Sequence, residues 1–545
     1  MSKYTVDQVG NYLSSGFWAG RTPVNLGSTI TVDLSSLTAA NDFLARAAIS
    51  AWADLGLNFS FATGGHADIK LQDDFSGAYT DWTRPRDNGW WFSTYYPTVN
   101  VGRDFTQAYG SKYGEYLSQT WLHEIGHALG LGHAGNYNNR ATYGIDNHYA
   151  NDSWQMSVMS YFAQDDNYTT GASFAYVLTP MPADIAAIEN LYDLQPTAGA
   201  GDTTYFWDTN AGGAHGRIGR MISNGTLADT PFTLTIMDRS GIDRLNFRGE
   251  TAAVNIDLTP GSINSAFGLR GNVLIERRTV IENVDGSAGN DVIKGQDADN
   301  QLIGRGGNDR LEGRAGQDDL VGNAGDDMLI GGTGDDRLTG GGGRDVLDGG
   351  AGSDTAVYIG ATGVLVDLAR PERNTGDAAG DRLISIENVI GTAGEDTLRG
   401  TAYDNRLVGG AGNDQLDGDW GVDILEGGAG NDVLRGGAGS DRLFGGDGAD
   451  RIVVDFGQDR VRGGDGADVF LFHGGQMTLV DFTDNVDDLV IYRAAVADAD
   501  LTKAEILDNA KIVGGDMLLY LTPSRLIRLE GVTDVSTLAD DLFLI

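Results

Sequence analysis

The sequence predicts an α+β domain at the N-terminus and a parallel β-roll in an all-β C-terminal half. Two patterns carry this prediction. Up to about residue 197, apolar residues follow mixed helix and strand periods, and from residue 286 a glycine- and aspartate-rich unit of nine residues repeats. The 545 residues exceed one ordinary domain, and 41% of them are hydrophobic, which is enough for packed cores.

Charge and cysteine content limit what the chain can bind. Asp and Glu number 77 against 38 Lys and Arg, and the formal net charge is −39. Such a chain repels nucleic acid and anionic membranes, and it suits hard cations, which bind through oxygen. The chain has no cysteine, so disulfides and cysteine-bound zinc are excluded. A transition metal must be held by nitrogen and oxygen, chiefly by the seven histidines.

The N-terminal domain is expected to contain three helices and several strands. Residues 42–52 have one apolar helical face, and PADIAAIENLYD (182–193) has another. SQTWLHEIGHALG forms a further helix, with Ser118 or Thr120 as its cap and Gly130 at its end. LNFSFAT and ADIKLQD alternate as strands do, and WWFSTYYPTVNVG follows them.

Two runs of nonapeptides fill the later part of the chain. The first covers residues 286–357 in eight units, and the second covers residues 391–471 in nine units. Similar lead-ins, IENVDGSAGND and IENVIGTAGED, precede the runs, which indicates an internal duplication.

Each half of the nonapeptide has its own structural role. The G-G-x-G-x-D half is a glycine-permitted turn whose carbonyls and aspartate can face a cation. The other half is a short strand with one inward apolar residue, such as Leu311, Leu320, Leu329, Leu338 and Leu347, or Leu416, Leu425, Leu434 and Leu443. Stacked turns of this kind predict a parallel β-roll with calcium ions between successive turns.

Aspartates at the sixth position are the predicted calcium ligands. Asn300 and Asn405 replace aspartate in the second unit of each run, so weaker calcium binding is expected there. The alternative, a disordered glycine–aspartate linker, is disfavoured by the regular register. Without calcium the aspartates repel, and calcium binding would then drive folding. The predicted ligands are Asp291, Asp309, Asp318, Asp327, Asp336, Asp345, Asp354, Asp396, Asp414, Asp423, Asp432, Asp441, Asp450, Asp459 and Asp468.

Residues 121–135, WLHEIGHALGLGHAG, hold three of the seven histidines. On a helix His123 and His127 are four residues apart, so they share a face and can reach one ion. Glu124 lies next to the first ligand and points towards a metal-bound water. Gly130 lets the chain leave the helix in a left-handed conformation, and His133 can then supply a third nitrogen. Three protein ligands with an open position are typical of catalytic zinc.

HExxHxxGxxH is the metzincin signature, which a methionine turn accompanies. SVMSY supplies that turn with Met159 and Tyr161. On these motifs the chain resembles the serralysins, the secreted zinc metalloproteases of Gram-negative bacteria, and a metzincin-like catalytic domain is expected. The resemblance covers nearly the whole length and also includes DIAAIENLY, GDTTYFWDTNAG, IENV and the nonapeptide repeats.

The resemblance implies one catalytic zinc ion and several structural calcium ions. Zinc would be bound by His123, His127 and His133, with Met159 as the floor beneath the metal. Glu124 is implied as the general base. Tyr161 is implied as an additional zinc ligand in the resting enzyme that swings to stabilise the oxyanion.

The chemistry agrees with these roles. Zinc lowers the pKa of bound water to about 7, and Glu124 can take the proton and pass it to the leaving amine. Residues 90–97 are expected to supply an edge strand where a substrate peptide adds in extended form. The separate histidines, His66, His148, His215 and His473, are expected to be surface or core residues.

Some features depart from the family pattern. Ala134 follows His133 where the family usually has proline, and no propeptide is evident before Tyr4. MDRSGID (237–243) only loosely matches the family's calcium-binding segment, with Asp238 and Asp243 as its candidate ligands. Two repeat blocks exceed the usual single roll, and the extra block could lengthen a spacer, add calcium-driven folding or bind a partner.

The two ends of the chain bear on its location. The N-terminus has no apolar signal segment, which by itself suggests a cytosolic protein. The last residues, DDLFLI, resemble the uncleaved signal that serralysins use for type I secretion, although a simple terminal strand is the alternative. Together with the repeats, this favours an extracellular protein. The expected partners are protein or peptide substrates, the type I secretion machinery and a proteinaceous inhibitor, for a monomer without membrane insertion.

The predicted organisation has six parts. They are a zinc metalloprotease domain (1–197), a β-rich connector (198–285), the first β-roll block (286–357), a connector (358–390), the second block (391–471) and a C-terminal β segment with the secretion signal (472–545).

Two other functions compete with a secreted zinc endopeptidase. One is a calcium-dependent adhesin or surface protein whose protease-like domain is dispensable. The complete ligand set disfavours it, because a binding module does not need Glu124. The other is a zinc-binding but inactive relative, which the presence of both Glu124 and Tyr161 disfavours.

Overall fold

The computed structural model describes residues 3–16, 25–27, 29–63, 67–82, 86–87, 90–91, 96–135, 137, 141–194, 200–496 and 502–545. They belong to two compact units, Met1–Gln296 and Asp297–Ile545. The first is α+β and the second is a parallel β-roll, so the predicted fold class is confirmed. The predicted domain boundaries remain predictions.

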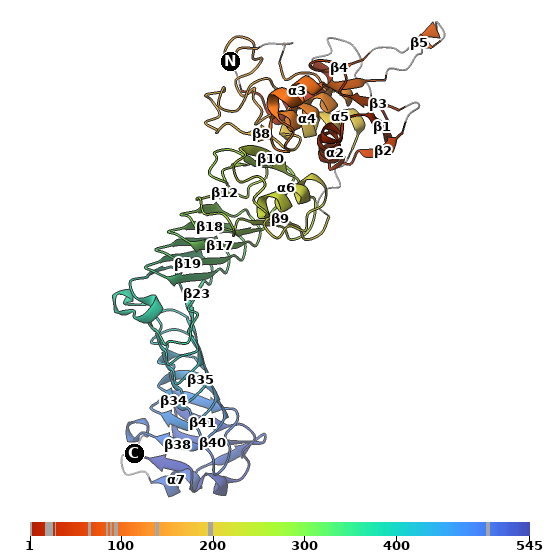
Figure 1. The fold of residues 1–545 in the computed structure, drawn as a ribbon. Helices are drawn as coiled ribbons and strands as arrows, with labels where there is room; N and C mark the ends of the chain where they lie inside the picture. The colour runs from red at the N-terminus through yellow and green to blue at the C-terminus, as the bar shows by residue number, and fades with distance from the viewer. Residues whose placement is uncertain are drawn as a thin grey trace. The chain divides into compact units, whose positions relative to one another are not determined.

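A five-stranded sheet with helices beside it forms the first part of the N-terminal unit (Figure 1). Its order is β2-β1-β3-β7-β4, and β4 runs antiparallel to β7 at one edge. The elements are α1 (Val6–Asn11), β1 (Thr29–Ser36), α2 (Ala39–Ala53), β2 (Asn58–Ala62), β3 (Ile69–Gln72), β4 (Ala78–Asp81), β5 (Arg86–Asp87), β6 (Trp90–Trp91), β7 (Thr98–Val101), α3 (Arg103–Tyr109), α4 (Tyr116–Ala128), β8 (Tyr176–Val177) and α5 (Pro182–Tyr192).

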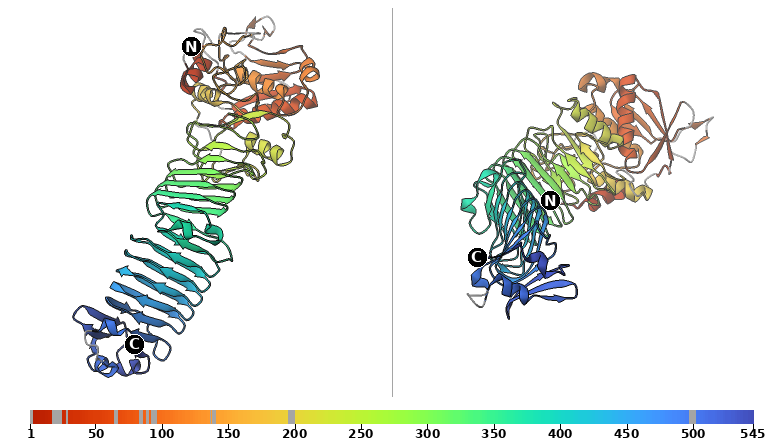
Figure 2. Two further views of the ribbon diagram at one scale, coloured as in Figure 1. Left: turned by 90° about the vertical axis from the view of Figure 1, so that its left-hand side faces the viewer. Right: turned by 90° about the horizontal axis from the view of Figure 1, so that it is seen from below.

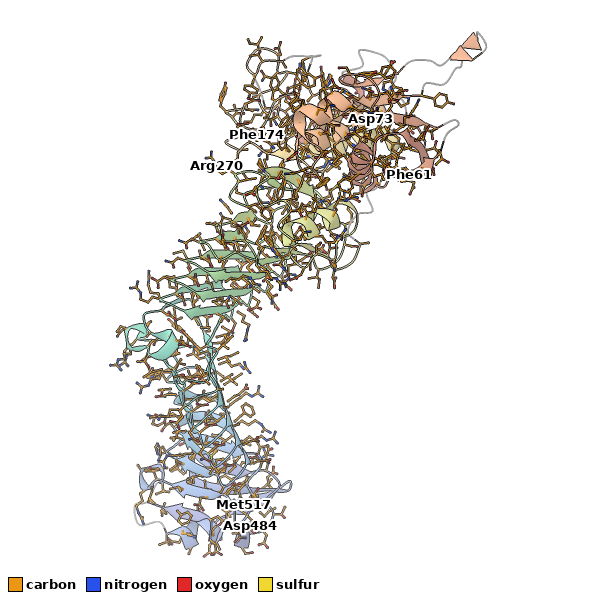
Figure 3. The ribbon with its side chains drawn as sticks, viewed as in Figure 1. Phe61, Asp73, Phe174, Arg270, Asp484 and Met517 are labelled. Atoms are coloured by element: carbon orange, nitrogen blue, oxygen red, sulfur yellow. The ribbon has the colours of Figure 1, made fainter. Side chains whose placement is uncertain are left out.

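Buried polar contacts fix α2 against its neighbours. Asp73, labelled in Figure 3, follows β3 and accepts hydrogen bonds from the Thr38 amide at 2.9 Å and from Asn41 Nδ2 at 3.0 Å. These bonds hold the first turn of α2. Trp52 is fully buried, and its Nε1 donates to the Leu122 carbonyl at 3.1 Å, which joins α2 to α4.

Residues 200–296 complete the N-terminal unit with short strands. One sheet has the order β13-β14-β10-β8, while β9, β11 and β15 pair in parallel, as do β12 and β16. The elements are β9 (Thr204–Phe206), α6 (Gly213–Ser223), β10 (Phe232–Ile236), β11 (Arg244–Asn246), β12 (Asn255–Asp257), β13 (Ile263–Asn264), β14 (Val273–Ile275), β15 (Asn283–Asp285) and β16 (Val292–Lys294).

The C-terminal unit is a stack of parallel strands with two nonapeptides per turn (Figure 2). Residues 18 apart are paired, so Leu302 lies beside Leu320 in one sheet and Leu311 beside Leu329 in the other. All four leucine side chains are fully buried. The predicted inward rows of leucine are therefore confirmed.

The strands of the first block are β17 (Gln301–Gly306), β18 (Arg310–Ala315), β19 (Asp319–Ala324), β20 (Met328–Thr333), β21 (Arg337–Gly342), β22 (Val346–Ala351) and β23 (Thr355–Val357). They are followed by β24 (Leu365–Asp367), β25 (Arg382–Ile384) and β26 (Asn388–Ile390). Residues 358–390 continue the stack, because β22 pairs with β25 and β23 pairs with β26. One parallel sheet thus runs through both repeat blocks.

The second block continues the parallel stack, and near the C-terminus β40 pairs antiparallel with β39 and β41. β42 pairs with β38, so the residues after Asp541 form a terminal strand. The elements are β27 (Thr397–Arg399), β28 (Arg406–Ala411), β29 (Gln415–Asp417), β30 (Ile424–Ala429), β31 (Val433–Arg435), β32 (Ala438–Gly439), β33 (Arg442–Asp447), β34 (Arg451–Val454), β35 (Phe456–Asp465), β36 (Val469–Phe472), β37 (Gln476–Leu479), β38 (Asp488–Ile491), α7 (Lys503–Asp508), β39 (Lys511–Val513), β40 (Asp516–Thr522), β41 (Arg525–Leu529) and β42 (Leu542–Leu544).

One local prediction is wrong. The helix that carries the first two histidines begins at Tyr116 after Glu115, so neither Ser118 nor Thr120 is its cap. Both hydroxyls lie inside the helix and donate back to carbonyls of the preceding turn, a competing use of such side chains. Within the described residues, none of the helices has the length and apolar character needed to cross a bilayer.

Candidate functional site

Three histidines converge where α4 ends. His123 and His127 lie on one face of α4, and the chain turns back through Gly130, whose φ is 98°. The Leu131 amide donates to the Gly126 carbonyl at 3.0 Å and closes this turn. The candidate ligand atoms of His123, His127 and His133 all lie within 4.8 Å of one another.

Hydrogen bonds set the tautomers of the two helical histidines. His123 Nδ1 lies 2.8 Å from the Val158 carbonyl, and His127 Nδ1 lies 2.8 Å from the Leu131 carbonyl. A carbonyl only accepts, so each Nδ1 must carry the proton and each Nε2 keeps a lone pair. Burial lowers the pKa of His123 to about 4 and that of His127 well below its usual value. Neutral imidazoles with oriented Nε2 atoms are the form that binds a transition metal.

Glu124 lies beside this cluster and is 7% exposed. Thr80 on the edge strand β4 donates from Oγ1 to Glu124 Oε2 at 2.9 Å, and the same hydroxyl lies 2.7 Å from the Glu124 carbonyl oxygen. Burial raises the pKa of Glu124 to about 7, while the Thr80 bond lowers it. A carboxyl held in this way is suited to accept and return a proton near neutral pH.

A cavity of about 400 Å³ opens beside the histidines, and its lining includes His123, Glu124 and Tyr161. The Tyr161 ring lies 4.6 Å from the His133 ring, centroid to centroid, at an interplanar angle of 70°. The cavity wall also contains Tyr116 and Trp154, so a peptide side chain would meet aromatic groups there.

Met159 is fully buried behind the histidine helix. A Cβ at Gly126 would lie 2.7 Å from Met159 Sδ, so glycine at this helical position permits the close approach of the methionine. The Ala134 amide donates to the Met159 carbonyl at 3.2 Å, which ties the loop after His133 to the methionine turn. Met159 thus packs against the helix that carries His123 and His127, and its role as the floor beneath a metal remains a prediction.

Sequence reasoning missed Asp184, a fully buried residue in the first turn of α5. Its carboxylate accepts bonds from Ser157 Oγ at 2.6 Å and from the amides of Val158 and Met181 at 2.8 and 2.9 Å. Since the Val158 carbonyl holds His123, Asp184 fixes that histidine through the methionine turn. An acidic residue two positions after Pro182 was the available signal.

The roll aspartates share one geometry. One carboxylate oxygen accepts the backbone N–H of the residue 18 positions earlier, as Asp336 Oδ1 does from Asp318 at 2.8 Å. Burial raises the pKa of Asp318 and Asp423 to about 7. A nearby cation would reverse such a shift, and carboxylate with carbonyl oxygen is the donor set that calcium prefers. Within the described residues, the second oxygen is buried without a hydrogen-bond partner in Asp318, Asp327, Asp336, Asp345, Asp354, Asp414, Asp423, Asp432, Asp441, Asp450, Asp459 and Asp468.

The first unit of each run differs. Asp291 accepts from the Val254 amide with one oxygen and from the Ser287 amide with the other. Asp396 makes the equivalent bonds to Val364 and Thr392. Protein donors thus already contact both oxygens of these two predicted ligands.

Two repeat positions, Asn300 and Asn405, have asparagine in place of the patterned aspartate. The Asp309 amide takes part in the ladder as a donor, to Asp327 Oδ1 at 2.7 Å. Asn405 Nδ2 donates to the Glu387 carbonyl at 2.7 Å and so places an amide where a carboxylate would attract a cation. Asn300 likewise stands in place of aspartate, and its amide donates to Asp318 Oδ1 at 2.8 Å.

Asp238 and Asp243 are both buried in the N-terminal unit. Tyr205 donates its hydroxyl to Asp238 Oδ2 at 2.6 Å, and the Thr203 amide donates to Asp243 Oδ1 at 2.8 Å. Burial, followed by the neighbouring carboxylates, raises the pKa of Asp243 to about 7. Two adjacent buried carboxyls fit the calcium site that the sequence suggested.

The separate histidines have local partners. His148 stacks on Tyr12 at 4.7 Å, and buried His215 has its Nε2 2.8 Å from the Thr235 carbonyl. His473 Nδ1 lies 2.8 Å from Asp455 Oδ1. His66 lies outside the described residues. Residues 92–95, half of the expected substrate strand, also lie outside them.

Comparison with known proteins found a family match in each half of the chain. The Peptidase M66 family matches residues 106–215, which contain the histidines, and RTX calcium-binding nonapeptide repeats match residues 285–320, 321–356, 390–425, 417–452 and 444–476. The chain is 35% identical to serralysin from Proteus mirabilis over 47% of this chain and 54% of that protein.

Two further relatives are named AprA. The metalloprotease from Pseudomonas entomophila is 30% identical over 55% of this chain and 65% of its own length. The metallopeptidase from Pseudomonas marginalis is 33% identical over 55% of this chain and 67% of its own length. The chain thus spans about half to two thirds of the length of these relatives. A lipase, LipA from Serratia marcescens, has a TM-score of 0.16 at 19% identity over 50% of this chain and 44% of its own, which carries no argument.

The fold and the histidine cluster, together with these relatives, define the class as a metallopeptidase-type domain followed by a calcium-binding roll. The chain belongs to the serralysin-type metalloproteases with RTX repeats.

Proposed function

We propose that this protein is an extracellular zinc-dependent endopeptidase that hydrolyses peptide bonds in extended protein segments and is folded by calcium. The convergence of His123, His127 and His133 beside Glu124 carries this proposal. The three imidazoles suit zinc because their candidate ligand atoms lie close together. Backbone carbonyls orient His123 and His127, and the lowered pKa of each keeps its ring neutral.

Different residues of the chain have different roles in the proposed reaction. Bound zinc would act as a Lewis acid and lower the pKa of a water molecule to about 7. Glu124 accepts a proton at its carboxylate and passes it to the leaving amine, while Thr80 holds the carboxylate in place. Tyr161, which lines the same cavity, donates its hydroxyl to the oxyanion that develops on the substrate carbonyl. The additional role of Tyr161 as a resting zinc ligand belongs to this proposal.

The position of β4 supports binding of extended substrates. β4 is the antiparallel edge strand of the five-stranded sheet, and its Thr80 contacts Glu124. An edge strand beside the proposed base can pair with a peptide in extended form, which gives affinity through main-chain hydrogen bonds and little dependence on side chains. We therefore assign substrate pairing to β4 in this proposal, while the expected role of residues 90–97 remains a prediction.

Calcium binding and location follow from the roll. The buried aspartates need a counter-charge, and extracellular modules of this kind bind calcium at about 10⁻⁴ to 10⁻³ M. The roll would therefore fold outside the cell, where calcium is abundant.

Hydrolysis of unfolded casein tests the proposal. Wild type and Glu124→Ala are compared in millimolar calcium with stoichiometric zinc, with zinc content measured for both. We expect activity in the wild type and a loss of about 10²- to 10⁴-fold in the variant, since a positioned general base contributes that much. An inactive wild type that holds zinc and is folded would contradict the proposal.

A further inference from the structure

Exposed aromatic side chains follow one turn edge of the second repeat block. Tyr403, Trp420 and Phe456 are 79%, 65% and 63% exposed. Trp420 and Phe456 stand at the third position of their nonapeptides, and Tyr403 stands at the fourth, where most units have glycine. Large exposed apolar groups in a row are uncommon on soluble surfaces and mark binding sites.

The parallel register aligns these residues along the stack. Trp420 bridges to Ala438, and Ala438 pairs with Phe456, so the two aromatic residues occupy the same column two strands apart. Their separation is about 10 Å, twice the ~4.8 Å spacing of neighbouring strands. Tyr403 lies at the preceding turn, where its backbone packs against Gly421.

A second row, in which three of four side chains can hydrogen-bond, runs beside the aromatic one. The fifth positions of the same units carry Asp404, Val422, Ser440 and Gln458. The Val422 amide donates to Asp404 Oδ1 at 2.7 Å, and the Gln458 amide lies 3.3 Å from Ser440 Oγ, which confirms the alignment. The turn segments 400–405, 418–423, 436–441 and 454–459 contain no lysine or arginine.

Building a roll does not require these aromatic residues. In the first block the third positions of the corresponding edge are Asp297, Ala315, Thr333 and Ala351. On the opposite edge of the second block they are Ala393, Ala411, Ala429 and Asp447. The aromatic residues are thus specific to one edge of one block.

We propose that this aromatic stripe, formed by Tyr403, Trp420 and Phe456 with Asp404, Ser440 and Gln458 beside it, binds an extended neutral β-1,4-linked polysaccharide. The C–H faces of sugar rings stack on aromatic rings, and sugar hydroxyls bond to carboxylate, hydroxyl and amide groups. In such a polymer every second ring presents the same face, which suits two stacking rings about 10 Å apart.

Charge and composition favour this occupant over others. The formal charge of −39 and the absence of basic residues in these turns oppose a nucleic acid or an acidic polysaccharide. A protein partner would favour an apolar patch with a dry centre, whereas Asp404, Ser440 and Gln458 flank these rings, with Val422 as the one apolar member of that row. This proposed binding site is separate from the proposed peptidase site. Its binding can therefore be tested with a catalytically inactive variant.

Full-length Glu124→Ala protein in millimolar calcium is titrated with cellohexaose by calorimetry, and its depletion by insoluble cellulose is measured. We expect binding that the added Trp420→Ala and Phe456→Ala changes weaken at least tenfold. Trp420→Tyr should retain most of it, because the ring can still stack. Tyr168→Ala, which removes an 82% exposed aromatic residue from the N-terminal unit, is the matched control and should bind normally.

Circular dichroism in calcium establishes that each variant is folded. Absence of cellohexaose and cellulose binding by the parent protein would overturn the proposal, and so would an equal loss in Tyr168→Ala. Sedimentation velocity identifies the main competing occupant. If the parent self-associates, fails to bind cellulose and becomes monomeric on Trp420→Ala, the stripe is an interface between copies of this chain.

Discussion

At the scale of residues, individual hydrogen bonds fix the orientation of the candidate site residues. The spacing of the histidines alone does not fix it. The Val158 carbonyl orients His123, Asp184 fixes Val158, and Thr80 holds Glu124. The bonds to His123 and Glu124 join α4 to segments distant in sequence, and the Asp184 bond joins α5 to the methionine turn. The candidate catalytic groups are therefore held by their surroundings, which is how a site keeps its geometry without a substrate.

Thr80→Val removes the donor to Glu124 while keeping the β-branched shape on β4. A hydrogen bond to a charged group contributes about 1.5–3 kcal/mol, so we expect kcat on a peptide substrate to fall about tenfold or more. Zinc content should not change, because Thr80 contacts none of the three histidine ring nitrogens. Thr80→Ser keeps the hydroxyl and should retain most activity. An unchanged kcat in Thr80→Val would show that Glu124 needs no such support.

Asp184 should make stability depend on pH in a defined direction. Burial raises its pKa from 3.8 to about 6. The native state therefore holds this proton more tightly than the unfolded chain, and the contribution is present below about pH 4 and lost as pH rises through about 6. Asp184→Asn does not titrate, yet its amide can accept from Val158 and Met181 and donate to Ser157.

Urea unfolding of wild type and Asp184→Asn at about pH 4.5 and pH 8 measures this effect. The unfolding free energy of the variant relative to wild type should rise between the two pH values. Other groups titrate equally in both proteins and cancel in the comparison. A difference that is the same at both pH values would contradict the assigned role of burial.

At the scale of elements, the turns of the roll depend on backbone conformation. In most repeats the glycine at the fourth position adopts positive φ, for example 125° at both Gly316 and Gly334. Arg314 and Asn323 adopt positive φ at second positions without being glycine, which costs about 1–2 kcal/mol each. Close stacking of turns must compensate for this strain.

Gly334→Ala should disrupt the first block. A Cβ there would lie 1.8 Å from the Gly316 carbonyl oxygen, at a φ that side chains rarely adopt. We expect a higher calcium concentration to be needed for folding, as followed by circular dichroism. Gly306→Ala is the matched control, because a Cβ at that third position meets nothing within 4 Å. Equal calcium midpoints for the two variants would show that turn stacking does not limit folding.

At the scale of the whole molecule, two kinds of metal chemistry are separated along the chain. The histidine cluster lies in the unit Met1–Gln296, and the regular rows of aspartate lie in Asp297–Ile545. Nitrogen ligands favour zinc and carboxylates favour calcium. We expect the unit with the buried carboxylates to be the one that depends on cations to stay folded.

Two chelators should therefore have separable effects. EGTA should remove most of the β signal in circular dichroism, because the buried aspartates of the roll lose their counter-charge. A zinc chelator such as phenanthroline, added in excess calcium, should abolish proteolysis and leave the β signal unchanged. Restoring each metal should reverse its own effect. A roll that keeps its full signal in EGTA would contradict the proposed coupling of calcium to folding.

The sequence predicted much of this arrangement from local patterns. The nine-residue period and its leucine rows predicted the parallel roll, because each repeat uses the same turn and the same inward residue. The spacing of His123, Glu124 and His127 predicted their place on one helix. The helix cap was wrong because Ser118 and Thr120 bond to carbonyls of the preceding turn, which a cap pattern does not reveal.

By itself the sequence determined the fold class, the histidine set and the repeat register, since each follows from a periodic or closely spaced pattern. Only the tertiary structure placed Thr80 on Glu124 and Asp184 behind Val158. It also aligned Trp420 with Phe456 and filled both carboxylate oxygens of Asp291 and Asp396 with protein donors. Such contacts join residues distant in the chain, and sheet register and packing decide them.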